Sequence, residues 1–142
     1  MYELKSVKIK IKETEPLLSN TPVNTPKEAV KLIGKEMEDL DREVLMVVNL
    51  QSDLRPINVN LVAVGVLDSA LVHPREVFKS AILSNAASII MIHNHPSGKL
   101  MPSKDDLDMT ERIKKAGEII GIKLLDHVIA GKNGELCSIL NS

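Results

Sequence analysis

Two nearly continuous apolar runs place the strongest constraint on how this chain can fold. Residues 43–50 and 87–93 are built almost entirely from Val, Leu, Ile, Met and Ala. Strands of this composition are buried on both faces, so other elements have to cover the sheet from two sides. Helical patterns lie between the predicted strands. This order indicates an α/β domain whose sheet mixes parallel and antiparallel neighbours.

Three segments carry the end signals and the apolar spacing of helices. Thr25 is the expected N-cap of the first helix, with Pro26 at its first position. The second helix is predicted over about 74–85, and the third over 103–120 with Gly121 closing it. Further strands are predicted at 57–66, 122–130 and 135–140.

The composition argues against nucleic-acid binding and against a membrane-spanning protein. The chain has 142 residues, a formal net charge of −1 and only two aromatic residues, Tyr2 and Phe78. Nucleic-acid binding relies on positive charge and on aromatic stacking platforms, so DNA is a weakly supported partner. The single cysteine, Cys137, excludes an intramolecular disulfide, and no run reaches the ~20 apolar residues of a membrane span. We therefore expect a cytoplasmic protein that does not bind membranes.

The first 25 residues form a separate unit in this prediction. Residues 4–12 nearly alternate apolar and basic side chains, which is typical of an edge strand with one solvated face. We expect residues 1–25 to be an N-terminal strand and arm, and residues 26–142 to be the main domain. An edge strand can pair with another chain, so strand 4–12 could support a homo-oligomer.

The segment that carries chemistry follows directly from the second apolar run. In an extended backbone His93 and His95 point to the same side, which gives two imidazoles at the end of a rigid strand. Asp106 lies in the first turn of the third predicted helix, where the intervening loop can bring it beside them. Two histidines and one carboxylate suit one zinc ion per chain and leave a fourth position for a reactive water. Iron or manganese would fit the same ligands.

A hydrolytic site also needs a proton acceptor, and Glu43 is the best candidate. It stands at the start of a strand that is otherwise apolar, where glutamate is rare without a partner. It could act as general acid/base, or it could form a salt bridge at the strand end with Arg42 or Lys31.

Other residues of the segment have structural interpretations as well. Ser103 and Asp106 have the spacing of a capping box, so each could simply begin the helix. The Ser103 hydroxyl could instead support an oxyanion. Asp126 and His127 are neighbours in a predicted strand and point to opposite sides, so His127 is interpreted as a buried, hydrogen-bonded structural histidine.

These residues resemble the JAMM motif of the MPN-domain metalloproteases. That motif is an upstream glutamate, then His-x-His, seven residues, Ser, two residues and Asp. Here it corresponds to Glu43, His93, His95, Ser103 and Asp106 without a gap. The string His-Asn-His is not the HNH nuclease motif, because the residues of that motif are dispersed.

The similarity is greatest to the bacterial RadC-like branch, over roughly residues 42–138. It rests on the segments 74–76, 81–87, 93–98, 102–103 and 125–127. The resemblance implies a cytidine-deaminase-like α/β/α sandwich around a mixed sheet. It also implies zinc held by His93, His95 and Asp106.

By the same resemblance, Glu43 would act as general acid/base and Ser103 would assist at the oxyanion. The implied activity is cleavage of peptide or isopeptide bonds in a peptide or protein substrate that the motif does not identify. The alternative is a non-enzymatic scaffold that acts in DNA repair by binding protein or DNA.

Overall fold

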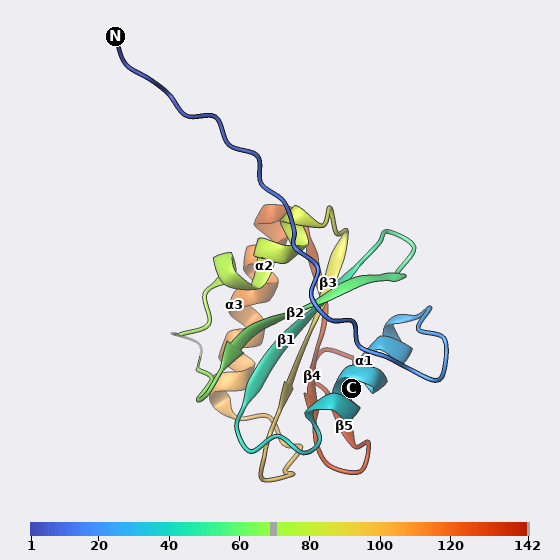
Figure 1. The fold of residues 1–142 in the computed structure, drawn as a ribbon. Helices are drawn as coiled ribbons and strands as arrows, with labels where there is room; N and C mark the ends of the chain where they lie inside the picture. Colours follow the sequence, from blue (N-terminus) through green and yellow to red (C-terminus); the bar gives the residue numbers. More distant parts are fainter. Residues whose placement is uncertain (69–70, 142) are drawn as a thin grey trace.

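A five-stranded mixed sheet forms the centre of the computed structural model, which describes residues 1–68 and 71–141 (Figure 1). The strand order across the sheet is β2-β1-β3-β4-β5. Only β3 and β4 are parallel neighbours, and the other three pairs are antiparallel. The predicted mixture of directions is therefore confirmed. The strands are β1 (Val44–Leu50), β2 (Pro56–Val64), β3 (Ser88–Asn94), β4 (Lys123–Ala130) and β5 (Leu136–Ser138).

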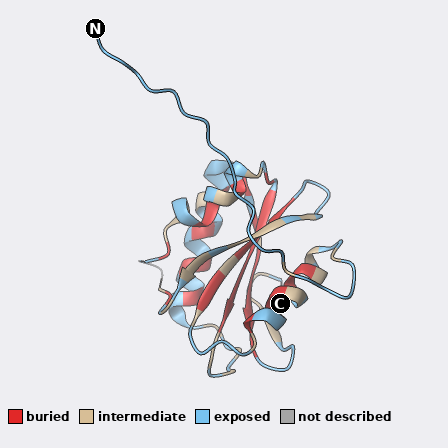
Figure 2. Ribbon diagram, in the orientation of Figure 1, coloured by how far each residue is buried: buried red, intermediate tan, exposed pale blue. Residues whose placement is uncertain are grey.

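Helices cover both faces of this sheet and complete the predicted α/β/α arrangement. Helix α1 (Pro26–Met37) packs on one face, and α2 (Pro74–Leu83) and α3 (Lys104–Ile120) pack on the other (Figure 1). Strand β3 is buried at every position and β1 at all but one, as Figure 2 shows in red. The two apolar runs are therefore covered from both sides, as their composition predicts.

The helix ends follow the signals in the sequence. Thr25 caps α1 through its hydroxyl, which accepts from the Glu28 N–H at 3.2 Å, and the Glu28 carboxylate accepts from the Thr25 N–H at 3.2 Å. Gly121 ends α3 in the left-handed conformation with φ of 86°. Helix α2 ends at Leu83, two residues before the predicted limit. All five strands match their predicted ranges to within two residues at each end.

The N-terminal segment departs from the prediction. Residues 1–24 contain no helix or strand. The first part of this segment extends away from the domain as an exposed chain (Figure 1), whereas Leu17 and Val23 further along are half-buried and pack against the core on the α1 side. Residues 4–12 pair with no strand in the described part of the chain, so the predicted edge strand is not formed there. Alternation is a local pattern, whereas a strand also needs a neighbouring edge to satisfy its N–H and C=O groups. Pairing of this segment with a second copy stays a prediction.

Residue 142, the predicted end of the domain, lies outside the described residues. Within them, no helix is both long enough and apolar enough to cross a bilayer.

Candidate metal centre

The ladder between β1 and β3 brings Glu43 and the two histidines to the same end of the sheet. Leu45 pairs with His93 in this antiparallel register, so two further residues along the ladder Glu43 falls opposite His95. Side chains two residues apart share a face of a strand. Leu45 packs in the core under α2 and α3. All three polar residues therefore face the same layer as α3.

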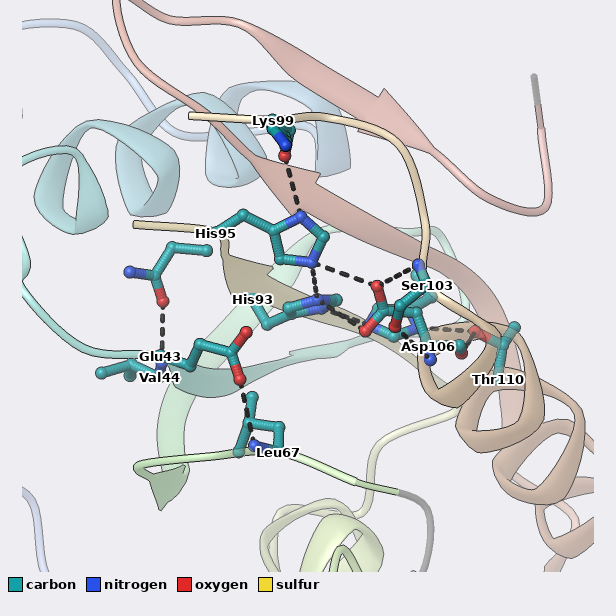
Figure 3. A network of polar contacts seen from close by, with 11 residues as sticks. Glu43, Val44, Leu67, His93, His95, Lys99, Ser103, Asp106 and Thr110 are labelled. Atoms are coloured by element: carbon teal, nitrogen blue, oxygen red, sulfur yellow. Dashed lines mark hydrogen bonds and ion pairs between the residues drawn. The ribbon is translucent and has the colours of Figure 1, made fainter. Parts of the chain in front are cut away.

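The three predicted ligands converge in this layer (Figure 3). The Nε2 atoms of His93 and His95 lie 3.0 Å apart. Asp106 Oδ1 lies 3.0 Å from His93 Nε2, and Asp106 Oδ2 lies 3.1 Å from His95 Nε2. One ligand atom from each of the three side chains fits within 4.8 Å. The His93 side chain is fully buried while that of His95 is 13% exposed, so solvent reaches the cluster from the His95 side.

Asp106 is both a helix cap and a candidate ligand. Its Oδ2 accepts from the Ser103 N–H at 2.8 Å, and its own N–H donates to the Ser103 hydroxyl at 3.1 Å. This reciprocal capping box fixes the carboxylate at the start of α3. The two interpretations of Asp106 are thus compatible, because the cap orients the same oxygen atoms that face His93 and His95.

A tight turn fixes the ring of His95. Gly98 has φ of 82° and donates its N–H to the His95 carbonyl at 2.8 Å. The turn brings the Lys99 carbonyl within 2.8 Å of His95 Nδ1. A carbonyl oxygen can only accept, so the ring proton of His95 lies on Nδ1. Its Nε2 is left with a lone pair that points at the cluster.

A second buried histidine supports His93. His127 Nε2 lies 2.7 Å from His93 Nδ1, and His127 Nδ1 lies 2.6 Å from the Thr110 hydroxyl oxygen. His127 is completely buried. That burial, together with the nearby His93, lowers the pKa of His127 to about 3, so its ring is neutral.

The interpretation of His127 as a buried, hydrogen-bonded histidine is confirmed. Its contact with a candidate ligand was not predicted from the sequence. That contact depends on β4 lying parallel to β3 with His127 opposite Met91, which places His127 on the same face as His93.

The electrostatics of the cluster favour a cation. Two imidazole nitrogens and a carboxylate converge as acceptors, and such an arrangement is stable only with a proton or a metal ion among them. Burial raises the pKa of Asp106, but the contact with the His93 ring, which can share a proton with the carboxylate when no metal is bound, and the hydrogen bond from the Ser103 N–H outweigh it and hold that pKa well below its usual range. Asp106 is therefore ionised at neutral pH.

Glu43 lies beside the cluster and is held by the segment after β2. One of its carboxylate oxygens accepts from the Leu67 N–H at 3.0 Å, and its backbone carbonyl accepts from the Gly65 N–H at 2.8 Å. Figure 3 shows the other carboxylate oxygen directed toward the histidines. Within residues 1–68 and 71–141, no lysine or arginine forms an ion pair with Glu43. Arg42 pairs instead with Asp41 at 3.2 Å.

Asn94, the residue between the two histidines, holds the backbone on either side of Glu43. Its side-chain oxygen accepts from the Val44 N–H at 2.7 Å, and its amide donates to the Arg42 carbonyl at 2.9 Å. The sequence contains a signal for this role. A polar side chain in a fully buried strand needs a partner, and alternation turns Asn94 away from the face of the histidines.

The donor set fits a divalent metal. Two imidazole nitrogens and one carboxylate oxygen are ligands of catalytic zinc sites and also of other transition metals. Each histidine has its second ring nitrogen engaged, one with a backbone carbonyl and one with His127, as is usual for metal-ligating histidines. His93, His95 and Asp106 can therefore hold a metal.

Comparison with known proteins gives a consistent result. The family model described as "RadC-like JAB domain" matches residues 23–142. A UPF0758 protein of Desulforudis audaxviator is 50% identical over 111 residues, which cover 78% of this chain and 48% of that protein. A UPF0758 protein of Thermotoga maritima is 49% identical over 100 residues, covering 70% of this chain and 45% of the relative. The chain thus spans about half the length of the curated relatives it matches.

Proposed function

The chain belongs to the RadC-like JAB domain family, and on this basis we propose that it is a zinc-dependent hydrolase of peptide or isopeptide bonds. The observation that carries the proposal is the convergence of His93, His95 and Asp106, with one oxygen of Glu43 directed toward them (Figure 3). A purely structural metal site would not need a glutamate beside it.

Zinc, when bound, would polarise a carbonyl group and make water acidic enough to deprotonate near neutral pH. The protein's own groups then have distinct tasks. Glu43 takes a proton from the attacking water on its free oxygen and delivers it to the leaving amine. The Leu67 N–H holds the other oxygen, so the carboxylate keeps its orientation during the transfer.

Ser103 can assist while it caps the helix. Its hydroxyl oxygen accepts from the Asp106 N–H at 3.1 Å, which uses a lone pair and leaves the hydroxyl proton free. We therefore propose that Ser103 donates this proton to the developing oxyanion of the substrate. The two roles that compete for Ser103 in the sequence use different parts of one hydroxyl group.

Exposed apolar side chains flank the site and favour a peptide substrate. Val66 precedes the Leu67 that binds Glu43, and Met101 lies in the loop before Ser103, with 83% and 82% exposure respectively. Apolar side chains of an extended peptide could pack on both.

The test combines metal analysis with a panel of peptide and isopeptide substrates. Wild-type protein should contain about one zinc per chain, and His93→Ala should lose it. Glu43→Gln should keep the zinc and lose turnover, because the amide cannot accept the proton. Full zinc occupancy in His93→Ala would overturn the ligand assignment. A panel without any Glu43-dependent cleavage would favour a non-enzymatic scaffold instead.

A further inference from the structure

We propose that His127, with Thr110 behind it, is a positioning residue that keeps the ring proton of His93 on Nδ1. The lone pair of the neutral His93 ring then lies on Nε2, the atom that would bind the metal. This inference rests on the proposed metal centre and concerns how the protein prepares it. Three buried side chains from three different elements are hydrogen-bonded in series: His93 of β3, His127 of β4 and Thr110 of α3. We call this series the relay.

Thr110, at the inner end of the relay, determines which atom donates and which accepts in each of its hydrogen bonds. The Thr110 hydroxyl oxygen lies 2.7 Å from the carbonyl oxygen of Asp106, which can only accept. The single hydroxyl proton must therefore lie between these two oxygens, because otherwise they would repel at this distance. Thr110 is then an acceptor toward His127 Nδ1, 2.6 Å away, so the ring proton of His127 lies on Nδ1.

The same assignment of protons extends from His127 to the candidate ligand His93. The His127 ring is fully buried between an imidazole and a hydroxyl group, an environment that favours the neutral form with one N–H. His127 Nε2 therefore carries a lone pair and accepts from its neighbour. That neighbour is His93 Nδ1 at 2.7 Å, which must donate. The neutral His93 ring therefore has its lone pair on Nε2, which faces Asp106 and His95, and a bound metal ion would take the place of any proton shared among these three groups. A single sequence of donors and acceptors thus sets the ligating atom of His93.

Burial makes this arrangement specific. Thr110 is 3% exposed, and His93 and His127 are fully buried, so water cannot replace a missing partner. The relay ends on the carbonyl of Asp106, whose side chain is itself a ligand. One turn of α3 therefore supplies both a ligand and the final acceptor, and it couples the placement of His93 to that of Asp106.

Two measurements on the full chain test the relay. In metal-free, ¹⁵N-labelled protein, two-dimensional ¹H–¹⁵N spectra of the imidazole rings should show His127 in the Nδ1–H form. Zinc affinity at fixed pH should fall about tenfold in Thr110→Val, which has the same shape but no hydroxyl. The matched control Thr110→Ser keeps the hydroxyl and should bind zinc within twofold of wild type.

A second pair of variants covers the case in which Thr110→Val does not fold. His127→Phe removes the acceptor for His93 and should weaken zinc binding by about 10–100-fold. His127→Gln retains an oxygen that can accept, and should recover part of that loss. Thermal melts of the metal-free proteins identify the variants whose fold is intact.

The relay is overturned if His127 carries its proton on Nε2, or if folded Thr110→Val binds zinc as tightly as Thr110→Ser. Neither readout depends on turnover. A confirmed relay without hydrolysis would therefore refute only the hydrolase. Conversely, Glu43-dependent hydrolysis with unchanged zinc affinity in Thr110→Val would refute only the relay. Wild-type protein that binds no zinc would refute both.

Discussion

Replacing Asn94 by alanine should disturb Glu43, the proposed general base, and leave the candidate metal ligands in place. Asn94 points to the face opposite to His93 and His95, and its side chain contacts the backbone on either side of Glu43. The substitution removes both hydrogen bonds without touching a ligand. It therefore tests whether the position of Glu43 depends on this amide.

The loss of stability in Asn94→Ala can be estimated from the two backbone groups that lose their hydrogen-bond partner. The Val44 N–H is buried, and leaving such a group unpaired costs ~1–3 kcal/mol. The Arg42 carbonyl belongs to an exposed residue and can bind water, so its loss is nearer ~0.5–1 kcal/mol. The sum is about 1.5–4 kcal/mol in free energy of unfolding, or roughly 5–15 °C in melting temperature for a domain of this size.

The expected effect on turnover is larger than the effect on zinc. A misplacement of a catalytic group by ~1 Å can cost ~100-fold in rate, so kcat should fall by about that factor. Zinc affinity should stay within about threefold of wild type, because the ligands and their partners are unchanged. Urea unfolding, zinc competition with a chromophoric chelator and kcat on a hydrolysed substrate measure the three quantities.

Asn49→Ala provides the matched control. Asn49 is also a fully buried asparagine of the sheet, but it bonds to the side chains of Asn58 and Ser80 at 2.7 and 3.0 Å, away from the site. It should lose stability and keep kcat. If Asn94→Ala keeps wild-type kcat, or if Asn49→Ala loses as much activity, the positioning of Glu43 by Asn94 is refuted.

Two further predictions concern the metal and the pH. Zinc at ~1,000 times its dissociation constant should stabilise the fold by ~4 kcal/mol, and EDTA should reverse the shift in thermal melts; unchanged melting would contradict a metal site confined to the folded state. In metal-free protein the lowered pKa of Asp106 means that its ionised form stabilises the fold. That contribution is complete above an ordinary aspartate pKa of about 4 and is lost as the pH falls through the lower folded value, so melting temperatures at pH 5 and pH 3 should differ less in Asp106→Asn than in wild type.

Local patterns in the sequence were sufficient for the layers and for the convergence of the three candidate ligands. The apolar run 87–93 predicts a strand buried on both faces, and the spacing of His93 and His95 then fixes their common face. The approach of Asp106 depends on the length of a loop and on the capping of α3, both of which the sequence indicates. These features are local, so periodicity and end signals are enough to predict them.

Features that depend on which strands are neighbours could not be predicted in this way. The contact between His127 and His93 requires β4 to lie parallel to β3 in one register. Segment 4–12 shows the opposite case, because its alternation predicts a strand but no edge in the described chain pairs with it. Alternation in a sequence predicts which side chains share a face of a strand. Only the sheet topology determines which strand pairs with it.

The three residues 93–95 show how far alternation alone can organise a site. Because neighbours on a strand point to opposite faces, His93 and His95 project to the α3 side and Asn94 projects to the α1 side. The same strand end thereby supplies two ligands and, through Asn94, holds the backbone around Glu43 in the adjacent strand. A one-residue slip of β3 against β1 would reverse these faces relative to Glu43 and separate the ligands from the base. The register of this one strand pair therefore brings the candidate metal ligands and the proposed general base together, although they lie about fifty residues apart in the chain.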